Sequence, residues 1–144
     1  MSDGGAGVQG YLVDLSEEES WELLASGVVG RIAWIRGDRP FVIPVNFTVD
    51  GTTIHIHSTP YSTLVREVDD TLVAFQVDDI DVGSRSGWTL VAQGRAEIRY
   101  PGALTPPGPS VDVWPAGPKA VTIVIDVAEV SGRRLTPGTP SRAT

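Results

Sequence analysis

Short apolar segments bounded by Gly, Pro and Asp recur along the chain and predict β-strands, and one of them alternates strictly between apolar and polar residues. In "TTIHIHS", Ile54 and Ile56 share one face of a strand while His55 and His57 share the other. We predict strands over residues 28–36, 41–49, 52–58, 71–79, 87–100 and 120–130.

Glycines and prolines mark where these strands end or bend. The "DG" pair at residues 50–51 predicts a type I′ hairpin, in which both central residues take positive φ. Gly94 predicts a β-bulge inside the fifth strand. The proline-rich residues 101–118 predict a loop or extended chain.

Two segments have helical signals. In "LSEEESWELLASG", Ser16 is a candidate N-cap, Glu19 completes a capping box, and Gly27 is expected to end the helix. A second, short helix is expected over residues 61–69. Trp21 and Trp34 are assigned to the core.

These elements predict a mainly β fold, a small barrel of about six antiparallel strands with two short helices. Closure is favoured because several strands are apolar on both faces. The domain is expected to span residues 11–135, between a flexible N-terminus (1–10) and a flexible tail (136–144).

Composition narrows the functional classes. Eleven Lys and Arg against 18 Asp and Glu give a net charge of −7, and the basic residues form no cluster, so nucleic acid is not an expected partner. No cysteine is present, which excludes disulfides and thiolate metal sites and fits the cytoplasm. No apolar run is long enough to predict a membrane span.

Hydroxyl side chains gather where the third strand meets the second helix. Ser58, Thr59, Ser62 and Thr63 could form a phosphate cradle at a helix N-terminus, or simply cap the helix, and the pattern leaves both open. His55 and His57, two residues apart, could both bind one metal ion. A metal site needs a third ligand, so polar strand residues are the favoured interpretation.

Several longer segments resemble the pyridoxamine 5′-phosphate oxidase-like family of FMN-binding split barrels. They are "GVVGRIAWIRGDRPFVIPVNFTVDGTTIHIHS", "VAFQVDDIDVGSRSGWTLVAQGRAEI", "VWPAG" and "VSGRRL". The resemblance implies a split β-barrel, a homodimer, and a flavin bound in a groove at the dimer interface. In such relatives, the segment matching Pro44, Val45 and Asn46 lies along the flavin ring.

The chain departs from this family where a flavin phosphate is expected to bind. Relatives usually carry Arg-Thr and then Gly and Lys, whereas this chain has His57, Ser58, Tyr61 and Thr63. Charge-assisted bonds to phosphate are roughly twice as strong as neutral ones, so we expect weakened FMN binding, with deazaflavin F420 less favoured. Arg31 and Arg66 are candidates to replace the missing cation.

Other residues complete the predicted site. Ser62 adds a hydroxyl. Trp88 and Trp114 could give flat contacts to the flavin or substrate. Trp114 could equally pack across a dimer interface. No catalytic nucleophile or triad is visible, as expected where a cofactor performs the chemistry.

Three functions remain open. The first is a flavin-dependent oxidoreductase acting on a small organic substrate. The second is a family member that binds flavin weakly, or another ligand, without catalysis. The third is a metal-binding barrel that uses His55 and His57.

Overall fold

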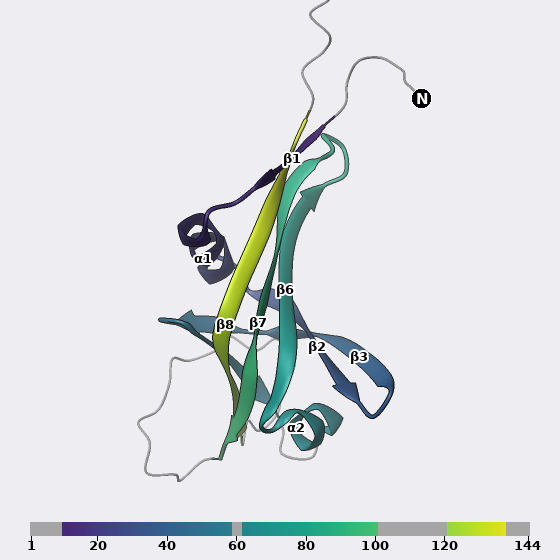
Figure 1. Cartoon of the computed structure of the whole chain (residues 1–144), viewed down its shortest axis with the longest axis vertical. Helices are drawn as coiled ribbons and strands as arrows, with labels where there is room; N and C mark the ends of the chain where they lie inside the picture. Colours follow the sequence, from purple (N-terminus) through teal and green to yellow (C-terminus); the bar gives the residue numbers. More distant parts are fainter. Residues whose placement is uncertain (1–9, 59–61, 101–120, 138–144) are drawn as a thin grey trace, which may run out of the picture.

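The computed structural model describes residues 10–58, 62–100 and 121–137, which form eight strands and two helices (Figure 1). In chain order the elements are β1 (Tyr11–Asp14), α1 (Glu17–Ala25), β2 (Val29–Arg36), β3 (Arg39–Asn46), β4 (Thr48–Asp50), β5 (Thr53–Ser58), α2 (Thr63–Val68), β6 (Thr71–Asp81), β7 (Ser86–Arg99) and β8 (Val121–Thr136). No helix in these residues is long and apolar enough to cross a membrane.

All strands join one antiparallel sheet in the order β3-β2-β6-β7-β8-β5-β4, and β1 pairs with the last residues of β8. The long strands β6, β7 and β8 run side by side through the length of the molecule (Figure 1). The sheet curls until β3 contacts β5, although four strands lie between them in the sheet order. The barrel therefore closes by side-chain packing at a split between β3 and β5, as the split-barrel prediction requires.

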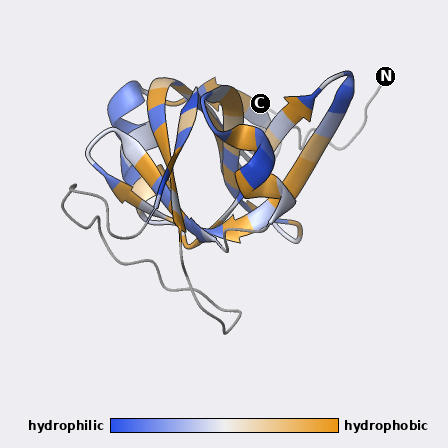
Figure 2. Cartoon of the chain, turned by 90° about the horizontal axis from the view of Figure 1, so that it is seen from below, coloured by the Kyte–Doolittle hydropathy of each residue, from blue (hydrophilic) through white to orange (hydrophobic). Residues whose placement is uncertain are grey.

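The barrel interior is filled by side chains from the inward positions of most strands. Ile32, Ile54, Phe75 and Ile123 are fully buried, and Phe75 meets Phe47 edge to face with ring centroids 4.8 Å apart. Apolar and polar positions alternate along the strands when the barrel is viewed from below (Figure 2). This alternation is the period of two that a pleated strand gives its side chains.

The first helix begins as its sequence predicts. Glu19 N donates to Ser16 Oγ at 3.0 Å and Ser16 N donates to Glu19 Oε1 at 3.2 Å, so the capping box is confirmed. The helix ends at Ala25 with Ser26 as its cap, one residue before the predicted Gly27. A Cβ at Gly27 would lie 2.9 Å from Phe47 Cζ, so this glycine makes room for the core ring.

Three strand predictions need correction. Eight strands form instead of about six, because β1 was not predicted and the expected strand 41–49 breaks at Phe47. Phe47 turns into the core, 4% exposed, and its N–H donates to Val28 O at 3.1 Å. The last strand runs to Thr136 instead of residue 130, because its final residues pair with β1.

The β4–β5 hairpin lies where "DG" predicts it, but the type I′ assignment is wrong. Asp50 pairs with Thr53, so the central residues are Gly51 and Thr52, and only Gly51 has positive φ (+61°). A register shift between Gln93 and Gly94 in the β7–β8 ladder confirms the position of the predicted bulge, although the extra residue, Ala128, belongs to β8. The predicted loop 101–118 and both flexible ends fall largely or wholly outside the described residues.

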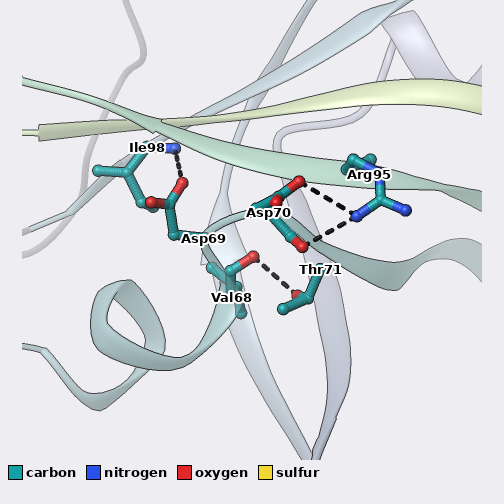
Figure 3. Close-up of polar contacts among 6 residues, drawn as sticks. All are labelled: Val68, Asp69, Asp70, Thr71, Arg95 and Ile98. Atoms are coloured by element: carbon teal, nitrogen blue, oxygen red, sulfur yellow. Dashed lines mark hydrogen bonds and ion pairs between the residues drawn. The ribbon is translucent and has the colours of Figure 1, made fainter.

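The second helix is shorter than predicted, six residues instead of 61–69, and its C-terminal end is fixed to β7 (Figure 3). Asp69 Oδ1 accepts a hydrogen bond from Ile98 N at 2.9 Å. Arg95 Nη1 donates to the backbone oxygen of Asp70 at 2.9 Å and to its carboxylate at 3.2 Å. These bonds hold Asp70 at a φ of 58° and fix where α2 lies relative to the split.

Candidate functional site

A pocket of about 370 Å³ lies at the split of the barrel, where β2 and β3 face the end of β5 and the start of α2. Its volume falls within the range of small-molecule sites. The lining residues are Trp34, Phe41, Ile43, Val45, Ile56, His57, Ser58, Ser62, Thr63 and Leu64. Five of the predicted site residues therefore meet at one pocket: Val45, His57, Ser58, Ser62 and Thr63.

The polar side of the pocket, which we call the hydroxyl rim, consists of Ser58, Ser62 and Thr63. The Ser58 and Ser62 hydroxyl oxygens lie 3.1 Å apart, within hydrogen-bond distance. Ser62 Oγ also accepts from Val65 N at 3.1 Å, so Ser62 is the N-cap of α2. The rim thus caps α2 and also lines the pocket. Helix capping and a phosphate cradle, the two interpretations left open for these hydroxyls, are therefore compatible.

A second part of the lining, which we call the ring wall, is formed by Trp34 and Phe41. Their rings stack with centroids 5.3 Å apart and an interplanar angle of 17°. Trp34 Nε1 donates to Glu67 Oε1 at 2.9 Å, and the Arg39 guanidinium lies 5.9 Å from the centroid of Phe41. Trp34 is buried as predicted, 5% exposed, and it also lines the pocket.

Sequence reasoning missed most of the apolar lining. Phe41, Ile43 and Val45 occupy alternate positions of β3, so one face of this strand supplies three lining side chains. Ile56 and Leu64 add to the same surface from β5 and α2. The alternation was readable in "FVIPV", but only the curl of the sheet directs this face toward β5.

Other predicted site residues lie outside the pocket lining. Arg31 Nη1 donates to Gln76 Oε1 at 3.1 Å and lies 3.7 Å from Asp78 Oδ2, while Pro44 is the cross-strand partner of Arg31. Asn46 Nδ2 lies 3.5 Å from Val28 O. Arg66 is exposed on α2.

Two predicted tryptophan contacts are not placed at this pocket. Trp88 is half-buried on β7 and pairs with Arg134 on β8. Trp114, Thr59 and Tyr61 lie outside the described residues.

A second pocket, of about 660 Å³, lies between β1, β7, β8 and the start of α1. Its lining combines apolar residues such as Leu15 and Leu90 with the charged Asp14, Glu17 and Arg133. It contains no predicted site residue.

The two histidines do not form a recognisable metal site in the described part of the chain, where no three His, Asp or Glu side chains gather suitably. His55 is 4% exposed, and its Nε2 lies 2.9 Å from Thr53 Oγ1. Its Nδ1 is buried without a hydrogen-bond partner among the described residues. Burial lowers the pKa of His55 from its ordinary 6.5; Arg99 and His57 lower it too, while Asp50 raises it.

A curled antiparallel sheet with a pocket at its split defines the split-barrel class of proteins, and comparisons with known proteins identify the family. The model of the pyridoxamine 5′-phosphate oxidase family matches residues 16–105. The chain therefore belongs to the pyridoxamine 5′-phosphate oxidase family. Among curated proteins, the uncharacterized Mycobacterium tuberculosis protein Rv0080 is 37% identical over 90 residues, which span 59% of each chain.

Solved structures share the fold over nearly their whole length. An FAD-binding protein from Mycobacterium smegmatis has a TM-score of 0.67 at 25% identity, covering 86% of this chain and 98% of that one. A candidate pyridoxamine 5′-phosphate oxidase from Corynebacterium glutamicum has a TM-score of 0.72 at 26% identity, covering 89% and 96%. An FAD-binding protein from Mesorhizobium loti has a TM-score of 0.70 at 20% identity, covering 89% and 99%.

The burial of His55 predicts a stability that falls in acid. Its pKa is lowered on folding, so well above pH 6.5 the histidine is neutral in both states and contributes no pH dependence. Below pH 6.5 the unfolded chain takes up the proton more readily, which lowers the free energy of unfolding. Urea unfolding at pH 7 and pH 5 should show a smaller loss in His55→Gln than in the unsubstituted protein.

The carboxylates are the same in both proteins and contribute equally to the two losses of stability. The difference between the losses therefore isolates the contribution of His55. Equal losses of stability between pH 7 and pH 5 in the two proteins would contradict the assignment.

Proposed function

We propose that the protein binds a flavin, FMN in particular, in the pocket at the split and acts as an oxidoreductase on a small organic substrate. The main support is the pocket itself, which joins a flat aromatic wall to a hydroxyl rim and includes five residues predicted for flavin binding. The Mycobacterium smegmatis relative, an FAD-binding protein at 25% identity, adds support for this class of ligand.

The pocket residues fit the parts of a flavin. Phe41, half-buried at the pocket and backed by the stacked ring of Trp34, offers an aromatic surface to a planar ring system, which the apolar lining would shield from water. Ser58, Ser62 and Thr63 suit the polar tail and its phosphate, with His57 beside them. When bound, a flavin supplies hydride or electron transfer, and the chain's own residues supply binding, orientation and the exclusion of water.

The second candidate function is flavin binding without catalysis. It is favoured by the pocket lining, in which no Arg or Lys is found among the described residues. A phosphate there receives neutral hydrogen bonds, which are roughly half as strong as charge-assisted ones. Turnover with a reduced nicotinamide donor and a flavin-loaded protein distinguishes the two functions.

A homodimer is the expected assembly, because an apolar surface lies on the outer face of the β3–β2–β6 region. Val42, Ala33 and Ala74 are direct cross-strand neighbours there, and Val42 is 61% exposed. Ile35 (68% exposed) and Leu72 (70% exposed) extend the same face. An apolar patch of this kind is typical of a protein interface.

We predict that light scattering at micromolar concentration gives about 31 kDa, twice the chain mass of 15.3 kDa. Replacing both Val42 and Leu72 with Asp places charges in the apolar patch and should shift the protein toward monomer. As a control, two exposed positions elsewhere, Thr52 and Ser84, also replaced with Asp, should leave the mass unchanged. A monomer before any substitution contradicts the dimer.

Restoring a cation at the hydroxyl rim should strengthen FMN binding. Thr63 is exposed at the start of α2, so Thr63→Lys can place an ammonium beside the phosphate without burying it. We expect FMN to bind about tenfold more tightly, equivalent to about 1.4 kcal/mol. Fluorescence titration measures the change, and Thr52→Lys, at the exposed β4–β5 turn, adds the same charge away from the pocket as a control.

An unchanged dissociation constant in Thr63→Lys, with the circular dichroism spectrum preserved, means that the rim is only a helix cap.

The identity of the flavin should depend on charge and pH. F420 carries a phosphate and an acidic tail, which the net charge of −7 disfavours, so FMN should bind more tightly than F420. An imidazole gains its charge toward pH 6, so FMN should bind more tightly at pH 6 than at pH 8, provided that its phosphate stays largely dianionic. His57→Gln should remove this difference. Tighter binding of F420, or FMN affinity that ignores pH, would refute the assignment of His57.

A further inference from the structure

We propose that the pocket selects its ligand by the planar ring and not by the phosphate, with Trp34 and Phe41 as the selecting residues and Glu67 as the residue that positions Trp34. This inference rests on the proposed flavin binding and refines it. A flavin without a phosphate, riboflavin, is then nearly as good a ligand as FMN at a pH where histidine is neutral.

The first argument is the placement of the arginines on the β2–β3 hairpin. Arg31 turns to Gln76 and Asp78 on the outer face of β2. Arg36 Nη1 lies 3.8 Å from Glu67 Oε2, and the Arg39 guanidinium lies over Phe41. The arginines of the β2–β3 hairpin thus interact with protein groups, and none of them lines the pocket.

The second argument is that the hydroxyl rim is partly occupied by the fold. Ser62 Oγ already accepts a bond from Val65 N and lies 3.1 Å from Ser58 Oγ. Helix α2 has six residues, too few for a substantial dipole to favour an anion. The rim can hold a hydroxylated chain as well as it holds a phosphate.

The third argument is the apolar share of the lining. Six of the ten lining residues are apolar, and two of these are the stacked rings of the wall. Contacts between planar rings contribute beyond the area they bury, so the ring system of the ligand supplies most of the binding free energy. The apolar residues are Trp34, Phe41, Ile43, Val45, Ile56 and Leu64.

Glu67 fixes the position of the Trp34 side chain in the ring wall. Its carboxylate is 16% exposed and accepts the indole N–H of Trp34 at 2.9 Å. Glu67 belongs to α2, the helix that also carries Thr63, so this bond ties the ring wall to the hydroxyl rim. Glu67 is not among the lining residues and therefore acts through Trp34.

The test is a fluorescence titration of the full chain with riboflavin and with FMN at pH 8. We expect the two dissociation constants to agree within about threefold, a difference of less than 0.7 kcal/mol. Trp34→Leu should weaken both ligands about tenfold, and Thr63→Lys should strengthen FMN alone. Should Trp34→Leu fail to fold, Phe41→Leu tests the same wall.

The role of Glu67 is tested with a matched pair of variants. Glu67→Gln keeps an acceptor for the indole N–H and should bind both flavins as the unsubstituted protein does. Glu67→Leu removes the acceptor and should weaken both flavins equally and shift the tryptophan emission. Equal affinity in both variants, with thermal stability changed alone, would reduce Glu67 to a structural residue and overturn its positioning role.

The outcomes separate this inference from the function on which it rests. Binding of neither flavin to the unsubstituted protein contradicts flavin binding itself. FMN binding at least tenfold more tightly than riboflavin, with Trp34→Leu and Phe41→Leu unaffected, leaves flavin binding intact and overturns selection by the ring.

Discussion

Strand β8 supports the rest of the structure because it pairs with three other strands. It pairs with β7 from Thr122 to Leu135, with β5 through residues 121–126, and with β1 at its C-terminal end. On the edge away from β7, β8 pairs with β5 as far as Asp126 and with β1 from Arg133 onward. Val127 N donates to Thr52 O at 3.1 Å, and the register shift opposite Gly94 follows directly, between these two stretches. A Cβ at Gly94 would collide with the backbone of Asp126, so the bend requires glycine. The curl that brings β5 toward β3, and hence the pocket, depends on this pairing.

The predictable parts of the fold were those encoded by neighbouring residues. The capping box at Ser16 involves a few adjacent positions and is confirmed, and Gly94 lies where the register of the β7–β8 ladder shifts. Strand β1 was missed because all four of its residues are exposed, so burial produces no alternation; pairing with β8 makes it a strand. The break at Phe47 was not predicted because Phe47 lies in an apolar segment. One more apolar residue there gives no sign that its side chain turns into the core.

The candidate site, like the fold, has one part that neighbouring residues predict and another that they do not. The hydroxyl rim was predictable because its residues lie within six positions of one another. The ring wall was not, because Trp34 and Phe41 face β5 and α2 only after the sheet has curled. Alternation along β2 already separates Arg31 from Ile32 and Trp34, so the strand pattern itself argued for an outward arginine. The placement of Glu67 against Trp34 joins residues 33 positions apart and leaves no local signal.

The outer apolar face of β3 and its neighbours bears on how the protein avoids aggregation. Strand β3 ends the sheet, and an end strand with free donors and acceptors invites another strand to extend the ladder. Pro40 and Pro44, both on β3, have no N–H to donate, and prolines in sheets occupy positions where the ladder is not needed. A second molecule can therefore cover the apolar face while the edge itself resists continuous fibre-like growth. The sequence thus permits a closed assembly and discourages an open one.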